Sequence, residues 1–358
     1  MNPIENYLKG NFKDDVITIQ EVFRVYDQNN DAFLDFEEFF ALVKDVFKKG
    51  QNTTKSEEIS TELVEALLKI FDTDKDKKIN LREFADVWRY WLKQILKPVT
   101  ALIIVDVQND FITGSLALKC CPAQQDGASV ISPINNLLDT VPFDVVIYSL
   151  DWHPENHISF YDNRSLRPFT PLNKEKSEVD VMDAVEFSGP PKTEQVLWPR
   201  HCVQDTEGSQ LHPDLKVVNK GFMVHKGTNP DIDSYSAFWD NGKLSQTELV
   251  NILVEHHVTD VYICGLAYDV CVGFTATHAT QHGFRTTFIE DASKGVIMED
   301  MKKTRNKLMN MGVVMANSHQ VEDMVLAKER CLKHGIKAAA NYFIARNIVQ
   351  TKPKQNLL

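Results

Sequence analysis

After residue 98 the chain contains five short apolar runs, and their spacing constrains the fold more than any other feature of the sequence. The runs are three to five residues long, and segments with helical apolar spacing lie between several of them. Continuous apolar runs suit strands buried on both faces of a parallel sheet, and their alternation with helices is typical of α/β domains. The expected strands are Ala101–Val105, Val145–Ser149, Val261–Cys264, Thr286–Ile289 and Val313–Met315, and the expected helices include Leu244–His256, Val270–Gln281 and Asp300–Asn310. The sequence therefore predicts an α/β fold, a parallel sheet flanked by helices.

Residues 152–212 interrupt this alternation. They are rich in Pro, His, Asn and Trp, which predicts long functional loops. Gly283 and Gly312 fall where two of the expected helices end, at positions that call for a left-handed residue.

The first 95 residues have a different pattern, a helix–loop–helix unit that occurs twice. The two units are 45 residues apart, counted from Asp27 to Asp72. Helical apolar spacing in both units predicts one shared core. The expected organisation is an all-α domain over residues 1–95, the α/β domain over 96–345, and a polar tail over 346–358.

Each helical unit contains a twelve-residue acidic loop that resembles the calcium loop of EF-hand proteins. Calcium is a hard cation that takes six to eight oxygen ligands, and these loops place oxygen-bearing residues at the usual positions. Ala32 and Lys77 stand at the sixth position, where Gly is usual because φ is positive, and each costs on the order of 1 kcal/mol. The alternative is an EF-hand pair that no longer binds metal. The expected ligands are Asp27, Asn29, Asp31, Phe33 through its carbonyl, Asp35 and Glu38, then Asp72, Asp74, Asp76, Lys78 through its carbonyl, Asn80 and Glu83. We expect Leu34 and Ile79 to pair the two loops through a short β-bridge.

The overall charge agrees with a protein that holds cations. The chain has 50 acidic and 39 basic side chains, a formal net charge of −11, which argues against nucleic acid or an anionic membrane as the main partner. The N-terminus lacks an apolar signal region, and no apolar run reaches the roughly 18 residues that a membrane helix needs. Six cysteines in 358 residues do not form a disulfide scaffold. We expect a cytoplasmic protein, with a nuclear location also left open.

Three separated motifs make residues ~99–340 resemble the isochorismatase-like cysteine hydrolases, and within them the nicotinamidases. They are Val105-Asp106-Val-Gln-Asn-Asp-Phe111, His225-Lys226-Gly227, and Gly265-Leu-Ala-Tyr-Asp-Val-Cys271. The resemblance implies a catalytic triad of Asp106, Lys226 and Cys271. An EF-hand pair ahead of such a domain is similar to the arrangement in insect nicotinamidases.

The chemistry of these residue types agrees with the resemblance. A thiol must become a thiolate to attack an amide, and the positive end of a helix and Lys226 would both lower the pKa of Cys271. Asp106 would take the thiol proton and later protonate the departing ammonia. The oxyanion donors would be the backbone amides of Ala267 and Cys271. The resemblance also implies a cis peptide bond between Leu266 and Ala267. Cys264 is expected to be a core residue.

The resemblance further implies a metal site and an aromatic pocket. Asp151, His153 and His201 match the ligands of a divalent metal, commonly Zn²⁺, and this residue set leaves coordination positions open. His157 matches a position that is a ligand in some members of the family and a neighbour in others. Flat side chains would hold a pyridine ring. The expected pocket residues are Phe111, Trp198, Tyr235 and Leu266, and Cys202 would flank the site without reacting.

The function implied is hydrolysis of nicotinamide to nicotinate and ammonia through a cysteine thioester, in NAD salvage. The alternatives are another amidase or isochorismatase-like hydrolase, or a calcium-binding protein with a decayed hydrolase domain. The expected ligands are nicotinamide, a divalent metal and Ca²⁺. A homo-oligomer is compatible with the sequence.

Overall fold

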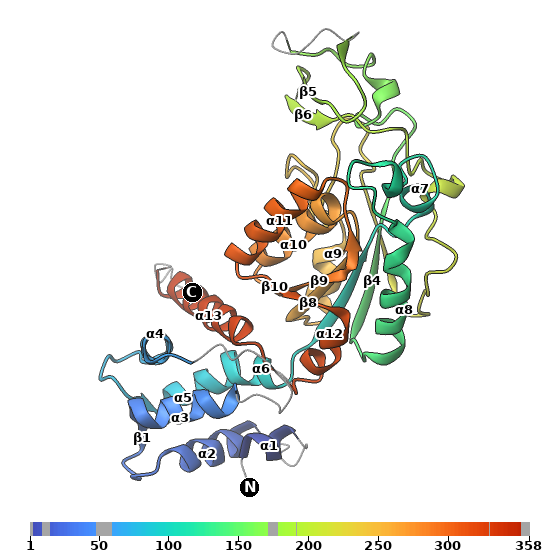
Figure 1. Ribbon diagram of the computed structural model, residues 1–358. Helices are drawn as coiled ribbons and strands as arrows, with labels where there is room; N and C mark the ends of the chain where they lie inside the picture. Colours follow the sequence, from blue (N-terminus) through green and yellow to red (C-terminus); the bar gives the residue numbers. More distant parts are fainter. Residues whose placement is uncertain are drawn as a thin grey trace. The chain divides into compact units, whose positions relative to one another are not determined.

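The computed structural model describes residues 3–8, 15–47, 59–170, 178–190, 192–328 and 330–351. The chain divides into two compact units (Figure 1). Unit 1 contains Met1–Pro98 and Asp323–Leu358, and unit 2 contains Val99–Glu322. The polar segment between the two helix–loop–helix repeats, residues 48–58, and the last residues of the expected tail, 352–358, lie outside the described part of the chain.

Unit 2 is built on a six-stranded parallel sheet with the order β10-β9-β8-β3-β4-β7. The central strand, β3 (Thr100–Val105), is buried along its whole length, as its apolar run predicted. The predicted α/β fold is therefore confirmed. The other strands are β4 (Val145–Asp151), β7 (Phe222–Lys226), β8 (Asp260–Leu266), β9 (Arg285–Lys294) and β10 (Val314–Ala316).

Strand order explains where a site can form. The chain runs outward from β3 to β4 and β7, returns to the other side of β3 as β8, and continues to β9 and β10. In open parallel sheets, ligands bind beyond the carboxyl ends of the strands at such a reversal point. The motifs that end in Asp106 and Cys271 follow the neighbouring strands β3 and β8, so this reversal brings them together.

Helices cover the sheet in two layers (Figure 1). Apolar residues of α9 (Leu249–Glu255), α10 (Gly273–Gln281) and α11 (Met298–Asn310) pack on one face. Helix α8 (Ile131–Thr140) lies on the other face. Two further helices, α7 (Asn109–Ile112) and α12 (Ser318–Val325), are shorter than α8. Gly283 and Gly312 have φ values of +94° and +84°, as their places after two helices predicted.

Two parts of the sheet architecture were not expected. Strand β7 was not predicted, although its last two residues belong to the second motif. Phe222–Lys226 alternates between buried and more exposed residues and does not form an apolar run. The segment expected to be loops contains an antiparallel pair, β5 (Ala184–Phe187) and β6 (Thr193–Val196). Val185 and Phe187 of β5 pack in a small separate core with Leu197, which follows β6.

Unit 1 contains the two predicted helix–loop–helix repeats. Its helices are α1 (Pro3–Leu8), α2 (Asp15–Tyr26), α3 (Phe36–Val46), α4 (Thr61–Phe71), α5 (Leu81–Val87) and α6 (Lys93–Leu96), with a π-helical turn at Trp88–Leu92. The strands β1 (Phe33–Leu34) and β2 (Ile79–Asn80) pair antiparallel, with Leu34 opposite Ile79 as predicted. One core of buried aromatic and aliphatic side chains joins both repeats.

The C-terminal helix α13 (Leu332–Thr351) belongs to unit 1. The expected boundary, with a hydrolase domain extending to residue 345 and a tail from 346, is therefore different from the one that the structure has. The reason is non-local packing, because Ala338 and Ala339 are buried in the core of the helical repeats. In the described part of the chain, no helix is long and apolar enough to cross a membrane.

Candidate active site and calcium loops

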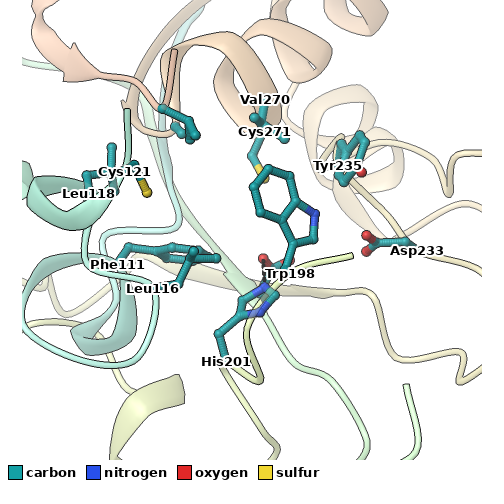
Figure 2. A pocket seen from close by; sticks show the side chains of 13 residues that line it. Phe111, Leu116, Leu118, Cys121, Trp198, His201, Asp233, Tyr235, Val270 and Cys271 are labelled. Carbon is teal, nitrogen blue, oxygen red and sulfur yellow. Dashed lines mark ion pairs between the residues drawn. The ribbon is translucent and has the colours of Figure 1, made fainter. Parts of the chain in front are cut away.

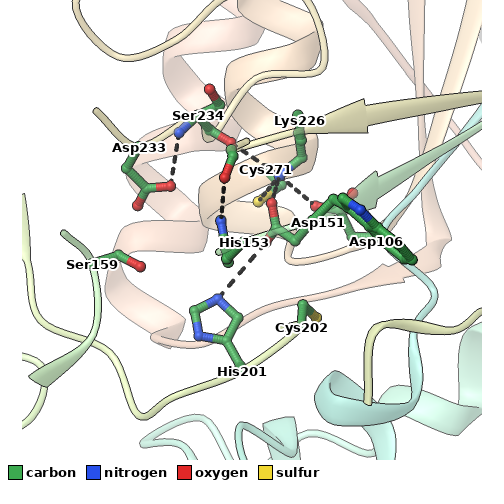
Figure 3. Close-up of polar contacts among 12 residues, drawn as sticks. Asp106, Asp151, His153, Ser159, His201, Cys202, Lys226, Asp233, Ser234 and Cys271 are labelled. Carbon is green, nitrogen blue, oxygen red and sulfur yellow. Dashed lines mark hydrogen bonds and ion pairs between the residues drawn. The ribbon is translucent and has the colours of Figure 1, made fainter. Parts of the chain in front are cut away.

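The three side chains of the predicted triad meet at the carboxyl edge of the sheet (Figure 3). Lys226 Nζ lies 2.9 Å from Asp106 Oδ2 and 3.3 Å from Cys271 Sγ. Lys226 also donates to the carbonyl of Ser234 at 3.0 Å and to the Asp151 carboxylate. The opposite side of Asp106 accepts a hydrogen bond from Ser149 Oγ at 2.7 Å. All these catalytic candidates are buried, so their charges act on one another with little screening by water.

Burial dominates the ionisation of these groups. It raises the pKa of Asp106 to about 6, although Lys226 acts in the opposite direction. It also raises the pKa of Cys271 well above its usual value, since the lowering by Lys226 is opposed by Asp106 and Asp151. Lys226 thus lowers the pKa of the thiol as predicted, but burial, which the sequence did not indicate, outweighs this effect. Burial thus favours the neutral thiol, and a carboxylate oxygen of Asp106, the candidate base, lies within 4.8 Å of the Cys271 sulfur.

The backbone around the site has an unusual geometry. Cys271 lies in a π-helical turn, Tyr268–Val272, that leads into α10. The peptide bond between Leu266 and Ala267 is cis, which confirms the prediction. Asp106 has a φ of +51°, and sparsely populated conformations of this kind cluster at functional sites. Gly265 has a φ of +119°, and a Cβ there would lie 2.1 Å from the Val105 carbonyl oxygen, so only glycine lets β8 approach β3 so closely.

Asp151, His153 and His201 offer ligand atoms that lie within 4.8 Å of one another. His153 Nε2 and His201 Nε2 are 3.6 and 3.8 Å from Asp151 Oδ2. Their Nδ1 atoms lie 2.8 Å from the carbonyl of Gly227 and 2.7 Å from that of Pro199. A backbone carbonyl on one ring nitrogen fixes the tautomer and leaves the other nitrogen as a metal ligand. The donor set therefore fits a divalent metal with open positions.

His157 lies beside this group but belongs to a different set of ligand atoms, with His153 and Asp233. Its ring stacks on His153 with a centroid distance of 4.0 Å, and its Nδ1 is 2.7 Å from Ser159 Oγ. Its Nε2 is buried and has no hydrogen-bond partner among the described residues. Burial, together with the charge of His153, holds the pKa of His157 well below its usual range. His157 is therefore close to Asp151, His153 and His201, and its unpaired Nε2 is compatible with both roles considered for it, ligand and neighbour.

A mostly apolar pocket extends from the Cys271 thiol to Asp151 and His201, two of the three candidate metal ligands (Figure 2). Phe111, Trp198 and Tyr235 line it, together with Cys271, Asp151, His201 and Ala267. Leu266 does not line the pocket. Its side chain is fully buried in β8 and points toward Gly127, because neighbouring strand residues face opposite sides of the sheet. Sequence reasoning missed the remaining lining residues, which are Leu116, Leu118, Cys121, Asp233, Val270 and Val296.

Two known domain families match this chain. The model of the isochorismatase domain matches residues 100–320, which is more than half of the chain. The chain belongs to the isochorismatase family. A model of an EF-hand domain pair matches residues 17–89.

Several nicotinamidases are similar to this chain. It is 36% identical over 228 residues to the nicotinamidase of Escherichia coli (strain K12), covering 63% of this chain and 97% of that protein. A structure of the Acinetobacter baumanii nicotinamidase pyrazinamidase matches with a TM-score of 0.53 and 35% identity, over 62% of this chain and 98% of the other. The yeast nicotinamidase bound to the inhibitor nicotinaldehyde matches with a TM-score of 0.52 and 31% identity, over 61% and 99%. The predicted resemblance to nicotinamidases is confirmed.

Two polar residues of the first motif, Gln108 and Asp110, position the segments that carry the candidate metal ligands Asp151 and His201. The Gln108 carboxamide is buried, accepts from the Asp151 amide at 2.9 Å and donates to the carbonyls of Asp151 and Ser209, both at 2.8 Å. Asp110 Oδ2 accepts from the amide of Cys202, the residue after His201, at 2.7 Å. Both residues belong to the first motif, although the sequence alone indicated no role for them. A polar residue on every second position after a buried strand is the signal that could have found them.

Cys264 is a core residue, as expected, and Cys202 lies beside the site. Cys264 is buried in β8, and Cys202 is buried next to His201 without lining the pocket. Burial raises the pKa of Cys202 well above its usual value.

The calcium loops have the backbone that calcium coordination requires. Ala32 and Lys77, the residues in place of Gly, both have a φ of +68°. The amides of these two residues donate to the Oδ2 atoms of Asp27 and Asp72, at 3.2 and 2.9 Å. In the second loop, the carboxylates of Asp72, Asp74 and Asp76 lie within 4.8 Å of one another.

The last acidic position of each loop also begins a helix. Asp35 and Glu38 form a capping box at the start of α3, and Asn80 and Glu83 form one at the start of α5. Expected calcium ligands therefore contribute to helix stability as well. The remaining expected ligands Asn29, Asp31, Phe33 and Lys78 lie in the same two loops.

Proposed function

We propose that this chain is a nicotinamidase, which hydrolyses nicotinamide to nicotinate and ammonia and so supplies nicotinate for NAD salvage. The observation that carries the proposal is that Cys271, Asp151 and His201 line the same apolar pocket. A nucleophile and a metal group on one cavity suit a flat substrate with an amide at one side and a ring nitrogen at the other. The nicotinamidase relatives support this choice of substrate.

Asp151, His153 and His201 would hold the metal, and two imidazoles with one carboxylate favour zinc. The bound ion would supply a Lewis-acidic position for the ring nitrogen of the substrate. The rings of Phe111, Trp198 and Tyr235 would contact the pyridine ring and hold its carboxamide toward Cys271.

The first half of the reaction is acyl transfer to sulfur. Asp106 takes the proton of the Cys271 thiol, and the sulfur forms a bond to the carboxamide carbon. Lys226, a cation held between Asp106 and Cys271, stabilises the thiolate as it forms. The backbone amides of Ala267 and Cys271 donate to the oxyanion of the tetrahedral intermediate. The C–N bond then breaks, and ammonia leaves with the proton that Asp106 holds.

The second half releases the acid. Asp106, again a carboxylate, takes a proton from a water molecule that attacks the thioester carbon. The C–S bond breaks, nicotinate leaves, and the proton returns to the Cys271 sulfur. The net reaction consumes one water and restores the thiol and the carboxylate.

Replacement of the nucleophile tests the proposal. Cys271→Ala should lower ammonia release from nicotinamide by at least about a thousandfold without a change in the circular dichroism spectrum. Cys264→Ala, at a buried cysteine seven residues earlier, is the matched control and should keep its activity. Substantial turnover by Cys271→Ala would contradict the proposed mechanism. Faster hydrolysis of other amides than of nicotinamide by the unmodified enzyme would favour a different amidase of the family.

For the helical repeats we propose calcium binding by both loops, supported by the EF-hand match and by the left-handed backbone at Ala32 and Lys77. Calorimetric titration should show two calcium ions per chain. Glu83→Gln, which weakens the last acidic ligand of the second loop, should remove one of them.

A further inference from the structure

The C-terminal helix α13 presents one face to the EF-hand repeats (Figure 1). The indole nitrogen of Trp91 donates to the Gly335 carbonyl at 2.8 Å, in a buried position. The ring of Tyr342 stacks on Phe71 and on Tyr90, with centroid distances of 5.2 and 5.4 Å. The Tyr342 hydroxyl donates to Asp86 Oδ2 at 3.1 Å. These partners come from the end of α4, from α5 and from the π-helical turn that follows it.

Two arginines fix the ends of this interaction. Arg330 donates to the carbonyl of Val46 at 2.6 Å, and Arg346 donates to that of Ile70 at 2.7 Å. Both carbonyls lie in the last turn of a helix, where unpaired acceptors and the negative end of the macrodipole favour a cation. Arg330, just before α13, and Arg346, within it, therefore bind the C-terminal ends of α3 and α4.

The contacts of α13 have the spacing of a helix bound in a groove. Gly335, Ala338, Ala339, Tyr342 and Arg346 follow each other at steps of one, three or four residues and occupy one face. A Cβ at position 335 would lie 2.3 Å from the Phe47 ring, so the glycine allows close approach. The small residues Gly335, Ala338 and Ala339 allow the helix to pack closely, and Tyr342 adds a large aromatic contact.

The helices that α13 contacts flank the second calcium loop. Helix α13 contacts α4, which enters the second calcium loop, and α6 with its preceding π-helical turn, which continue the helix that leaves the loop. In sensor EF-hands, calcium changes the angle between the entering and leaving helices and opens an apolar groove. A helix seated between them has to favour one angle over another.

We propose that the EF-hand pair is an intramolecular receptor for α13, and that calcium binding and docking of this helix stabilise each other. The inference rests on the proposed calcium binding. Linkage requires the coupling to be reciprocal: if calcium favours the helix arrangement that holds α13, then docked α13 raises the calcium affinity by the same factor. Helix α12 connects β10, the last strand of the hydrolase sheet, to α13. Docking of α13 that depends on calcium would therefore restrain the segment that follows β10.

Removal of the central aromatic contact tests this coupling in the full-length chain. Tyr342→Ala should weaken calcium binding about five- to tenfold and speed hydrogen exchange of the α13 amides. Gly335→Leu, which drives a side chain into Phe47, should do the same through a different contact. Ile344→Ala, at a position of α13 that is 56% exposed, is the matched control and should change neither. In the unmodified protein, calcium should slow exchange in α13.

The outcomes separate the two proposals. Absence of calcium binding by the unmodified chain would overturn the calcium proposal and the coupling with it. Normal calcium binding that both α13 variants leave unchanged would overturn the coupling alone. Faster exchange of α13 when calcium is added would also overturn it, because calcium would then oppose docking. Nicotinamide hydrolysis is measured separately and bears on neither result.

Discussion

The ammonium nitrogen of Lys226 lies 3.3 Å from the sulfur of Cys271, and both side chains are buried. The same nitrogen is paired with Asp106 and Asp151, and these carboxylates raise the pKa of Lys226 well above its usual value although burial acts against them. The lysine is therefore a permanent cation that stabilises two buried carboxylates at rest and a thiolate during the reaction.

Lys226→Met should remove both effects. We expect loss of nicotinamide hydrolysis and a fall of about 3–5 kcal/mol in the free energy of unfolding, because two buried carboxylates lose their cation. The double variant Lys226→Met/Asp106→Asn should recover part of the stability, measured by denaturant unfolding, and none of the activity. Substantial nicotinamide hydrolysis by the single variant Lys226→Met would show that the lysine acts only on stability.

The pH dependence of kcat/KM should report Asp106. Only its carboxylate can take the thiol proton, and its raised pKa of about 6 means that activity falls roughly tenfold per pH unit below that value. Ser149 donates to this carboxylate and lowers its pKa. Ser149→Ala should therefore move the acidic limb upward by about half to one pH unit, measured at saturating metal. If Ser149→Ala leaves the acidic limb of the kcat/KM profile unchanged, that limb reports a group other than Asp106.

Much of this site was predictable because its parts follow strands directly. Asp106 and Cys271 come after β3 and β8, which are neighbours in the sheet, so local motifs placed them correctly. The paired calcium loops were predictable for the same reason, since ligand positions and the Leu34–Ile79 bridge are set within each loop.

The parts that sequence reasoning missed depend on packing between distant segments. The docking of α13 on the EF-hand repeats joins Trp91 to Gly335 and has no local signal. The raised pKa of Cys271 follows from complete burial, which a helix start and a nearby lysine do not reveal. Leu266 was expected in the pocket, but its side chain is fully buried and lies near Gly127 instead.

Asp110 should affect metal binding although it is not a ligand. Its carboxylate holds the amide of Cys202 and so positions His201. Asp110→Asn places an amide donor near a backbone donor, and we expect metal affinity to fall about ten- to a hundredfold, as for other groups that support metal ligands. The control is Asp126→Asn, since Asp126 also accepts from a backbone amide, that of Ala128. Chelator competition gives both affinities, and equal values would remove Asp110 from the metal site.

Lys78 of the second calcium loop should weaken calcium binding at the first. Its Nζ lies 2.8 Å from Asp31 Oδ2, an expected ligand, so calcium has to displace the ammonium group. Exposed ion pairs contribute little to stability, and Lys78→Gln should therefore raise the calcium affinity of the first loop by no more than about fivefold. Lys75→Gln removes the same charge from the second loop and leaves the Lys78–Asp31 pair in place. Calorimetric titration distinguishes the two: an equal gain in both variants would mean that net charge, and not this pair, sets the affinity. High salt should reduce the difference between Lys78→Gln and the unmodified chain, because it screens the ion pair.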